Sequence, residues 1–255
     1  MKLKPSETYA ESQAQQVLLD QLEVTVRNRM AKEINRYIRA YAETYGDAVM
    51  EAFIAKEHER RVTDILAKNI KKTAPLFGKL VRRQIDAATK QTSPTFYQDI
   101  ADKWLLTRGL EEASGIAATT TERIKAAIAV ALTETVSVAV IAKAIRDVAK
   151  LTPYRAAMIA RTETHNAAMF ATEQSAIEAS KDLGIKLQKF WVPVQDARTR
   201  DNHAAMSSHD GIDLDENFNV GGVMMSRPSD PKGGAANVIN CRCTLVHRRK
   251  QIEIE

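Results

Sequence analysis

Cysteine is nearly absent from this sequence. Two of the 255 residues are cysteines, Cys241 and Cys243, and a single residue separates them. In an extended chain, residues at i and i+2 have their Cα atoms near the upper limit for a disulfide, so a bridge between them would be strained. A disulfide scaffold is therefore excluded, and a reducing compartment is the simpler interpretation.

Aromatic residues and long apolar runs are scarce as well. Aromatic residues make up 5% of the chain, and the most apolar run, at 124–142, is interrupted by Lys125 and Glu134. No apolar stretch follows the lysines of the first residues. We therefore expect neither a membrane span nor a signal peptide.

The positive charge of the chain is concentrated in its first part. Residues 1–150 have 24 Lys and Arg against 19 Asp and Glu, and residues 56–90 alone have ten against four. Such a segment suits contact with phosphates, although a solvated helix face is the alternative, and the few aromatics argue against stacking on single strands. The candidate polyanion-binding residues are Lys68, Lys71, Lys72, Lys79, Arg82 and Arg83.

Apolar residues recur every three or four positions in the first part of the chain, which predicts long helices. One stripe runs from Leu19 to Tyr45, after which Gly46 is expected to end the helix and Asp47 to begin the next. That second helix is expected to break at Pro75. Helix starts are predicted at three later places: Ser93-Pro94, the capping box Thr119–Glu122, which would open an Ala- and Val-rich helix or helix pair reaching about Lys150, and Thr152-Pro153.

The pattern changes near Gly184. Residues 185–192 alternate apolar and polar side chains, and six of the ten glycines lie at or beyond 184, as is typical of short strands and loops. We predict a mainly α N-terminal region with long helices at 1–150, a compact α+β domain with short strands at 151–250, and a tail at 251–255.

The two cysteines have two interpretations. If 238–247 is a strand, Cys241, Cys243 and His247 share one face, where two thiolates could bind a zinc ion and His203 and His247 could complete its tetrahedral site. Alternatively the cysteines are small buried apolar residues, because their spacing differs from the Cys-x-x-Cys of zinc knuckles.

A second cluster of polar residues begins on the helix that follows Pro153. Arg161 and His165 lie on its apolar stripe, so both are expected to be buried and to need partners such as Glu163, Asp196 or Asp201. The alternative is an active site with His165 or His203 as base, although no catalytic motif accompanies them. The predicted structural network comprises Arg161, Glu163, His165, Asp196, Arg198, His203 and Arg242.

Several uncommon motifs occur together in a fixed order. They are Arg161-Thr-Glu-Thr-His165, Trp191, Asp196-x-Arg-Thr-x-x-x-His203, Phe218-x-Val220, Pro228-x-Asp-Pro-x-Gly-Gly234 and Val238-Ile-Asn-Cys-Arg-Cys243. This order, over about residues 150–248, resembles the Mu F-like phage head morphogenesis family of minor head proteins. Residues 1–150 resemble the family only in forming a long helical region that precedes the shared motifs.

The resemblance implies a minor capsid protein without enzymatic activity, present in several copies at the portal. The partners it implies are the portal protein, the major capsid protein and packaged double-stranded DNA. It places the chain inside the virion head near the portal vertex, and in the host cytoplasm during assembly. Many family members have a Cys-x-x-Cys pair where this chain has Arg200 and His203, so two thiolates of a four-thiolate zinc site are replaced and one ligand is lost. No cofactor besides such a structural zinc is expected.

Two alternatives to this function remain open. One is a nuclease or cysteine-dependent hydrolase that uses His203, Cys241 and His165. The other is a DNA-binding scaffold that makes no contact with the portal.

Overall fold

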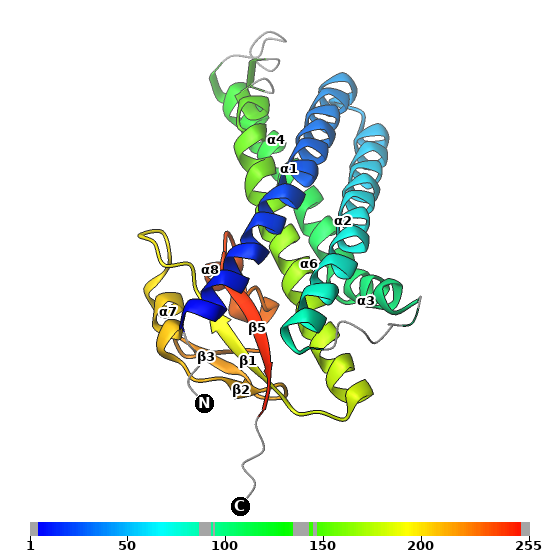
Figure 1. Cartoon of the computed structure of the whole chain (residues 1–255). Coiled ribbons are helices and arrows are strands. Elements are labelled where there is room, and N and C mark those ends of the chain that lie inside the picture. Colours follow the sequence, from blue (N-terminus) through cyan, green and yellow to red (C-terminus); the bar gives the residue numbers. More distant parts are fainter. Residues whose placement is uncertain (1–4, 87–92, 94, 135–142, 145–146, 251–255) are drawn as a thin grey trace, which may run out of the picture. The chain divides into compact units, whose positions relative to one another are not determined.

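The computed structural model describes residues 5–86, 93, 95–134, 143–144 and 147–250. Long helices precede a C-terminal part with short strands, which confirms the predicted fold class (Figure 1). The helices that precede the strands are α1 (Pro5–Thr44), α2 (Ala48–Gln84), α3 (Phe96–Trp104), the short π-helix η1 (Leu105–Gly109), α4 (Leu110–Glu134) and α6 (Thr152–Leu183). The C-terminal elements are β1 (Leu187–Val192), α7 (Asp201–Ala204), η2 (Ala205–Ser208), β2 (Ile212–Asp213), β3 (Phe218–Val220), β4 (Val223–Met225), η3 (Pro231–Gly233), α8 (Gly234–Val238) and β5 (Thr244–Arg249).

The chain divides into two compact units. Unit 1 comprises 1–22, 70–103 and 161–255, and unit 2 comprises 23–69 and 104–160. This division differs from the predicted boundary at 150, because the first turns of α1 and the second half of α2 belong to unit 1. The predicted tail at 251–255 lies outside the described residues.

The sheet of unit 1 is antiparallel, in the order β2-β1-β5, and Trp191 of β1 pairs with Leu245 of β5. The first turns of α1 contact β5, since Gln15 Nε2 donates to the carbonyl of Leu245 at 3.0 Å and Thr244 Oγ1 donates to Ser12 Oγ at 2.8 Å. Figure 1 shows β1 and β5 as neighbours beside this end of α1. Residues 230 positions apart in the sequence therefore form one layer.

Residues 162–172 of α6, in unit 1, are all buried. A helix buried on every face has no solvent side on which to place polar residues. Thr162, Glu163, His165 and Asn166 therefore lie in the interior, where each polar atom needs a partner. This stretch supplies much of the frame of the candidate site.

In unit 2, residues of α1 and α2 pack around the buried carboxylate of Glu33. Glu33 lies 2.8 Å from His58 Nδ1 and also accepts hydrogen bonds from Arg36, while the His58 ring stacks on Tyr37 at 4.2 Å. Burial raises the pKa of Glu33, but the hydrogen bonds of Arg36 and His58 outweigh it and leave that pKa lowered. A buried hydrogen bond and a ring contact thus join the first two helices in unit 2.

The predicted turn between the first two helices is confirmed. Gly46 has φ 95°, a left-handed conformation that favours glycine, and Asp47 Oδ1 accepts from the backbone N–H groups of Val49 and Met50 at 3.1 Å. Both signals are local, which is why the sequence reveals them.

Two predicted helix boundaries are wrong. α2 continues through Pro75, because the buried side chains of Phe77 and Val81 anchor the turns that follow. Thr119 and Thr121, expected to open a helix, lie inside α4 and donate their hydroxyl protons to the carbonyls of Gly115 and Ala117. A threonine hydroxyl can accept from a backbone N–H group at a helix start, or donate to a carbonyl of the preceding turn inside a helix. The sequence alone therefore does not distinguish the two positions.

Some predictions fall partly outside the described residues. These are Pro94 of the expected cap and positions 135–142 and 145–146 of the Ala- and Val-rich segment. Among the residues that are described, no helix has the length and apolar character needed to cross a membrane.

Candidate metal centre

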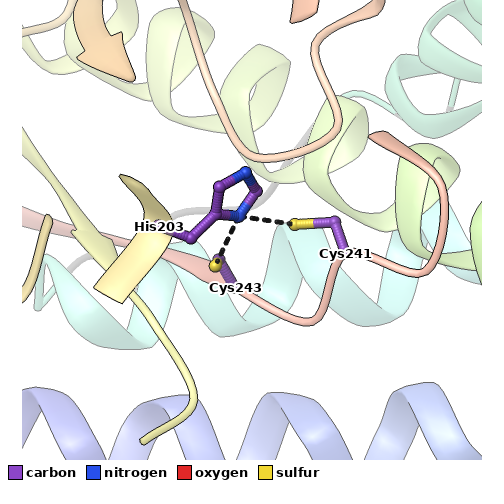
Figure 2. Close-up of side chains that lie close together, drawn as sticks. All are labelled: His203, Cys241 and Cys243. Carbon is purple, nitrogen blue, oxygen red and sulfur yellow. Dashed lines mark hydrogen bonds between the residues drawn. The ribbon is translucent and has the colours of Figure 1, made fainter. Parts of the chain in front are cut away.

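Three potential metal ligands converge in unit 1. His203 lies on α7, and Cys241 and Cys243 lie in the loop between α8 and β5. The Nδ1 atom of His203 is 3.3 Å from the sulfur of Cys243 and 3.7 Å from that of Cys241 (Figure 2). All three side chains are buried, each with 2% of its surface exposed. Figure 2 shows the nitrogen directed between the two sulfurs.

The local structure around the cysteines differs from the predicted strand. Residues 239–243 form a loop, and β5 begins at Thr244. Asn240 has φ 56°, a left-handed conformation that asparagine tolerates better than most residues. The loop curves so that both sulfurs face His203, and strand alternation is not what brings them together.

Hydrogen bonds fix which nitrogen of His203 faces the cysteines. Asn237 Oδ1 lies 3.4 Å from His203 Nε2 and accepts a hydrogen bond from Asn202 Nδ2 at 2.8 Å. An amide oxygen can only accept, so Nε2 carries the proton. Nδ1 is then unprotonated, and its lone pair points at the two thiols.

The two thiols influence each other's acidity. The hydrogen bond from Cys243 holds the pKa of Cys241 well below its usual range. The same bond to Cys241 and burial raise the pKa of Cys243 well above it. Cys241 is therefore the sulfur that first carries the negative charge.

Helix α6 holds this loop in place. Thr162 Oγ1 accepts from the backbone N–H of Asn240 at 3.2 Å, and Arg161 Nη1 donates to the side chain of Asn240 at 3.4 Å. From the other side, Arg200 Nη2 donates to the carbonyl of Ile239 at 2.6 Å. The loop is thus fixed through its backbone, independently of the sulfur atoms.

His165 also contacts this loop. Its Nε2 is 2.6 Å from the carbonyl oxygen of Cys243, and its Nδ1 is 2.7 Å from Ser229 Oγ. Because a carbonyl only accepts, Nε2 donates and Nδ1 accepts from the serine hydroxyl. Burial lowers the pKa of His165, so the ring is neutral. The expected carboxylate partner of His165 is therefore wrong.

The rest of the predicted network lies elsewhere. Arg242 donates to Asp196 at 2.7 Å, and Arg198 is 3.5 Å from the same carboxylate. Arg242 holds the pKa of Asp196 well below its usual range. Glu163 is buried on α6. The structure thus separates an exposed ion pair at Asp196 from the buried contacts of His165, where the sequence predicted one network.

His247, predicted as a fourth metal ligand, lies outside the cluster. Among the described residues, the His, Cys, Asp and Glu side chains close enough to share an ion there are His203, Cys241 and Cys243. His247 is fully buried on β5, and neither ring nitrogen has a hydrogen-bond partner among the described residues. The strand begins six residues later than predicted, at Thr244 instead of 238, and this explains the error, because the loop gives Cys243 an orientation that β5 does not share.

The predicted polyanion-binding residues lie on α2. Lys71, Lys72, Lys79 and Arg83 are exposed in unit 1, and Lys68 is exposed on the part of α2 in unit 2. Arg82 is different: 5% of its surface is exposed, and it lies 3.7 Å from Asp182. It is therefore not available to a polyanion.

Four residues important to the site were not predicted: Ser229, Asn237, Asn240 and Arg200. Ser229 and Asn240 have positive φ values of 58° and 56°. The motifs around them, Pro228-x-Asp and Val238-Ile-Asn, contain turn-forming residues and could have indicated special backbone positions. Their partners, 34 to 78 residues away, could not be read from the sequence.

Comparison with known proteins agrees with the motif order. The sequence of residues 122–246 matches the family described as phage Mu protein F like protein. Residues 122–246 belong to this family. The match includes His165, His203, Cys241 and Cys243, so the candidate metal centre and its α6 support lie within the Mu F-like segment.

Two relatives are similar to part of this chain. The NAD(+)--arginine ADP-ribosyltransferase EFV of Enterococcus faecalis (strain ATCC 700802 / V583) is 34% identical over 110 residues, which are 43% of this chain and 22% of that protein. Minor head protein GP7 of Bacillus phage SPP1 is 35% identical over 97 residues, which are 36% of this chain and 29% of that protein. This chain thus spans less than a third of either relative. No solved structure matches it.

The burial of His247 predicts an acid-sensitive stability. Burial, then the charges of Lys189 and Arg248, lower its pKa to about 3. Below about pH 6.5 the unfolded chain binds a proton at this residue and the folded chain does not, so stability falls toward about pH 3 with a slope approaching about 1.4 kcal/mol per pH unit. The free energy of unfolding is measured by chemical denaturation in metal-free buffer from pH 7 to pH 4. It should decrease less steeply with falling pH in His247→Leu than in the wild type. Equal slopes would contradict the assignment.

Proposed function

We propose that this chain is a minor head protein that associates with the portal and acts in head assembly. The observation that carries the proposal is the Mu F-like match over residues 122–246, joined by the likeness to minor head protein GP7. In this proposal, several copies bind each portal, with the major capsid protein as a further neighbour. The chain lies inside the virion head near the portal vertex after assembly in the host cytoplasm.

An exposed apolar patch in unit 2 supports binding to a partner protein. Val49 and Phe53 have 79% and 65% of their surfaces exposed, one turn apart on α2, and Tyr45 and Met50 beside them are also exposed. We call these four residues the hairpin-tip patch. A group of large exposed apolar side chains is costly in water unless another protein covers it. The portal protein is the partner that the minor head likeness suggests.

A basic face in unit 1 supports proximity to packaged DNA. Lys71, Lys72, Lys79 and Arg83 fall within about a third of the circumference of α2, as follows from 3.6 residues per turn. All four side chains are exposed. Lysine and arginine on one helix face attract phosphates without reading the base sequence, which suits contact with DNA of any sequence.

We propose an assembly role and no enzymatic one. His165, the candidate base, has both ring nitrogens engaged by Ser229 and Cys243, and the candidate nucleophile Cys241 is buried. A base or nucleophile must reach its substrate, so these contacts favour a structural role. The segment shared with the ADP-ribosyltransferase is 22% of that protein, which gives no support to a transferase activity here.

Portal association is tested with the hairpin-tip patch. Portal complexes purified from phage that carry both Val49→Lys and Phe53→Glu should contain about tenfold less of this chain than wild-type complexes. The reason is that two charges replace the proposed apolar contact. The matched control is Leu106→Lys, which changes another exposed apolar residue of unit 2. Retention is measured by quantitative immunoblot. Wild-type portal complexes that lack this chain would refute the portal proposal.

DNA contact is tested by charge reversal. Glutamate at Lys71, Lys72, Lys79 and Arg83 should lower the slope of log affinity against log salt for duplex DNA by about three to four, since each phosphate contact contributes about 0.9. The control reverses Lys150 and Lys232, two exposed lysines that are not part of α2. Binding is followed by fluorescence anisotropy. An unchanged slope would refute the basic face, whereas DNA binding with no portal retention would favour the scaffold alternative.

A further inference from the structure

The ligand atoms of His203, Cys241 and Cys243 are spaced as a tetrahedral zinc ion requires. Zinc binds cysteine sulfur at about 2.3 Å and histidine nitrogen at about 2.0–2.1 Å, which places nitrogen and sulfur about 3.5 Å apart at the tetrahedral angle. The observed separations from His203 Nδ1 are 3.3 and 3.7 Å. The three ligand atoms all lie within 4.8 Å of one another. One ion could therefore contact all three.

The protonation state of His203 also suits a metal. A histidine ligand must present a bare nitrogen, and the opposite N–H usually donates to an oxygen that orients the ring. Asn237 Oδ1 provides that oxygen, and Asn202 fixes the orientation of the Asn237 amide. The nitrogen left without a proton is the one that faces the sulfurs.

The loop that holds the two cysteines is fixed by contacts that do not involve sulfur. Asn240 is anchored to Thr162, Ile239 to Arg200, and the carbonyl of Cys243 to His165. A metal would then bind a site that is already formed, with little ordering cost. A disulfide between the two cysteines would need a strained short ring, so metal binding suits the spacing better.

We propose that His203, Cys241 and Cys243 bind one zinc(II) ion. Two thiolates and one imidazole are a soft donor set that favours zinc. The described residues provide three ligands, so the proposal assigns the fourth position to a ligand from outside them, such as water. The ion joins α7 to the loop before β5, two segments about 40 residues apart, and stabilises the C-terminal part of unit 1. This proposal is independent of portal association.

Metal content is the first test. The full chain is purified without chelator and its zinc measured by inductively coupled plasma mass spectrometry, with an expected content of about one ion per chain. Cys241→Ser, Cys243→Ser and His203→Gln should each reduce this content at least about tenfold. His209→Gln, an exposed histidine close in sequence, is the matched control and should retain the ion. Zinc that is absent from the wild type, or equal in wild type and variants, would overturn the proposal.

Cobalt substitution gives a second test that does not depend on folding of the cysteine variants. Cobalt(II) added to the metal-free wild-type chain should give the visible bands of a tetrahedral site and a thiolate-to-cobalt charge-transfer band. Asn237→Leu keeps all three ligands but removes the oxygen that orients His203, and should weaken zinc affinity about 10–100-fold in competition with a chelating dye. Octahedral cobalt bands without charge transfer, or unchanged affinity in Asn237→Leu, would contradict the proposed coordination.

Discussion

The hydrogen bonds of His165 hold together three segments of unit 1 that are distant in the sequence. Its ring, on the fully buried part of α6, accepts from Ser229 and donates to the carbonyl of Cys243, 64 and 78 residues away. A buried polar atom left without its partner costs about 1–3 kcal/mol, so each of these contacts restricts where the chain can lie. This restraint acts on the loop before β5 together with the hydrogen bonds from Thr162 and Arg200.

The position of the candidate metal centre follows from that restraint. Once the carbonyl of Cys243 is held by α6, the thiol of Cys243 is directed to the opposite side, toward His203 on α7. Asn237, at the end of α8, sets the orientation of the His203 ring. Hydrogen bonds from two helices thus place three ligand atoms whose own attraction would not be sufficient to order the loop.

The sequence predicted what depends on local signals. The turn at Gly46 and Asp47 and the strand near Leu187–Val192 follow from backbone preference and side-chain alternation, and the structure confirms them. The strand over Cys241 and Cys243 was wrong, since Asn240 adopts a left-handed conformation that α6 stabilises. The meeting of His203 with the cysteines was therefore predicted on an incorrect premise, and the same premise wrongly included His247. Tertiary contacts decide these features, and no local pattern encodes them.

The Mu F-like segment thus provides a rigid core, while the hairpin-tip patch and the basic face provide the surfaces that we propose for assembly. The core depends on the tautomers of two buried histidines. These tautomers can be measured directly in the metal-free protein. Nitrogen-15 chemical shifts of the ring nitrogens should show both His165 and His203 protonated at Nε2 and bare at Nδ1. A proton on Nδ1 of His203, or a doubly protonated ring of His165 at neutral pH, would contradict the hydrogen-bond frame described for this site.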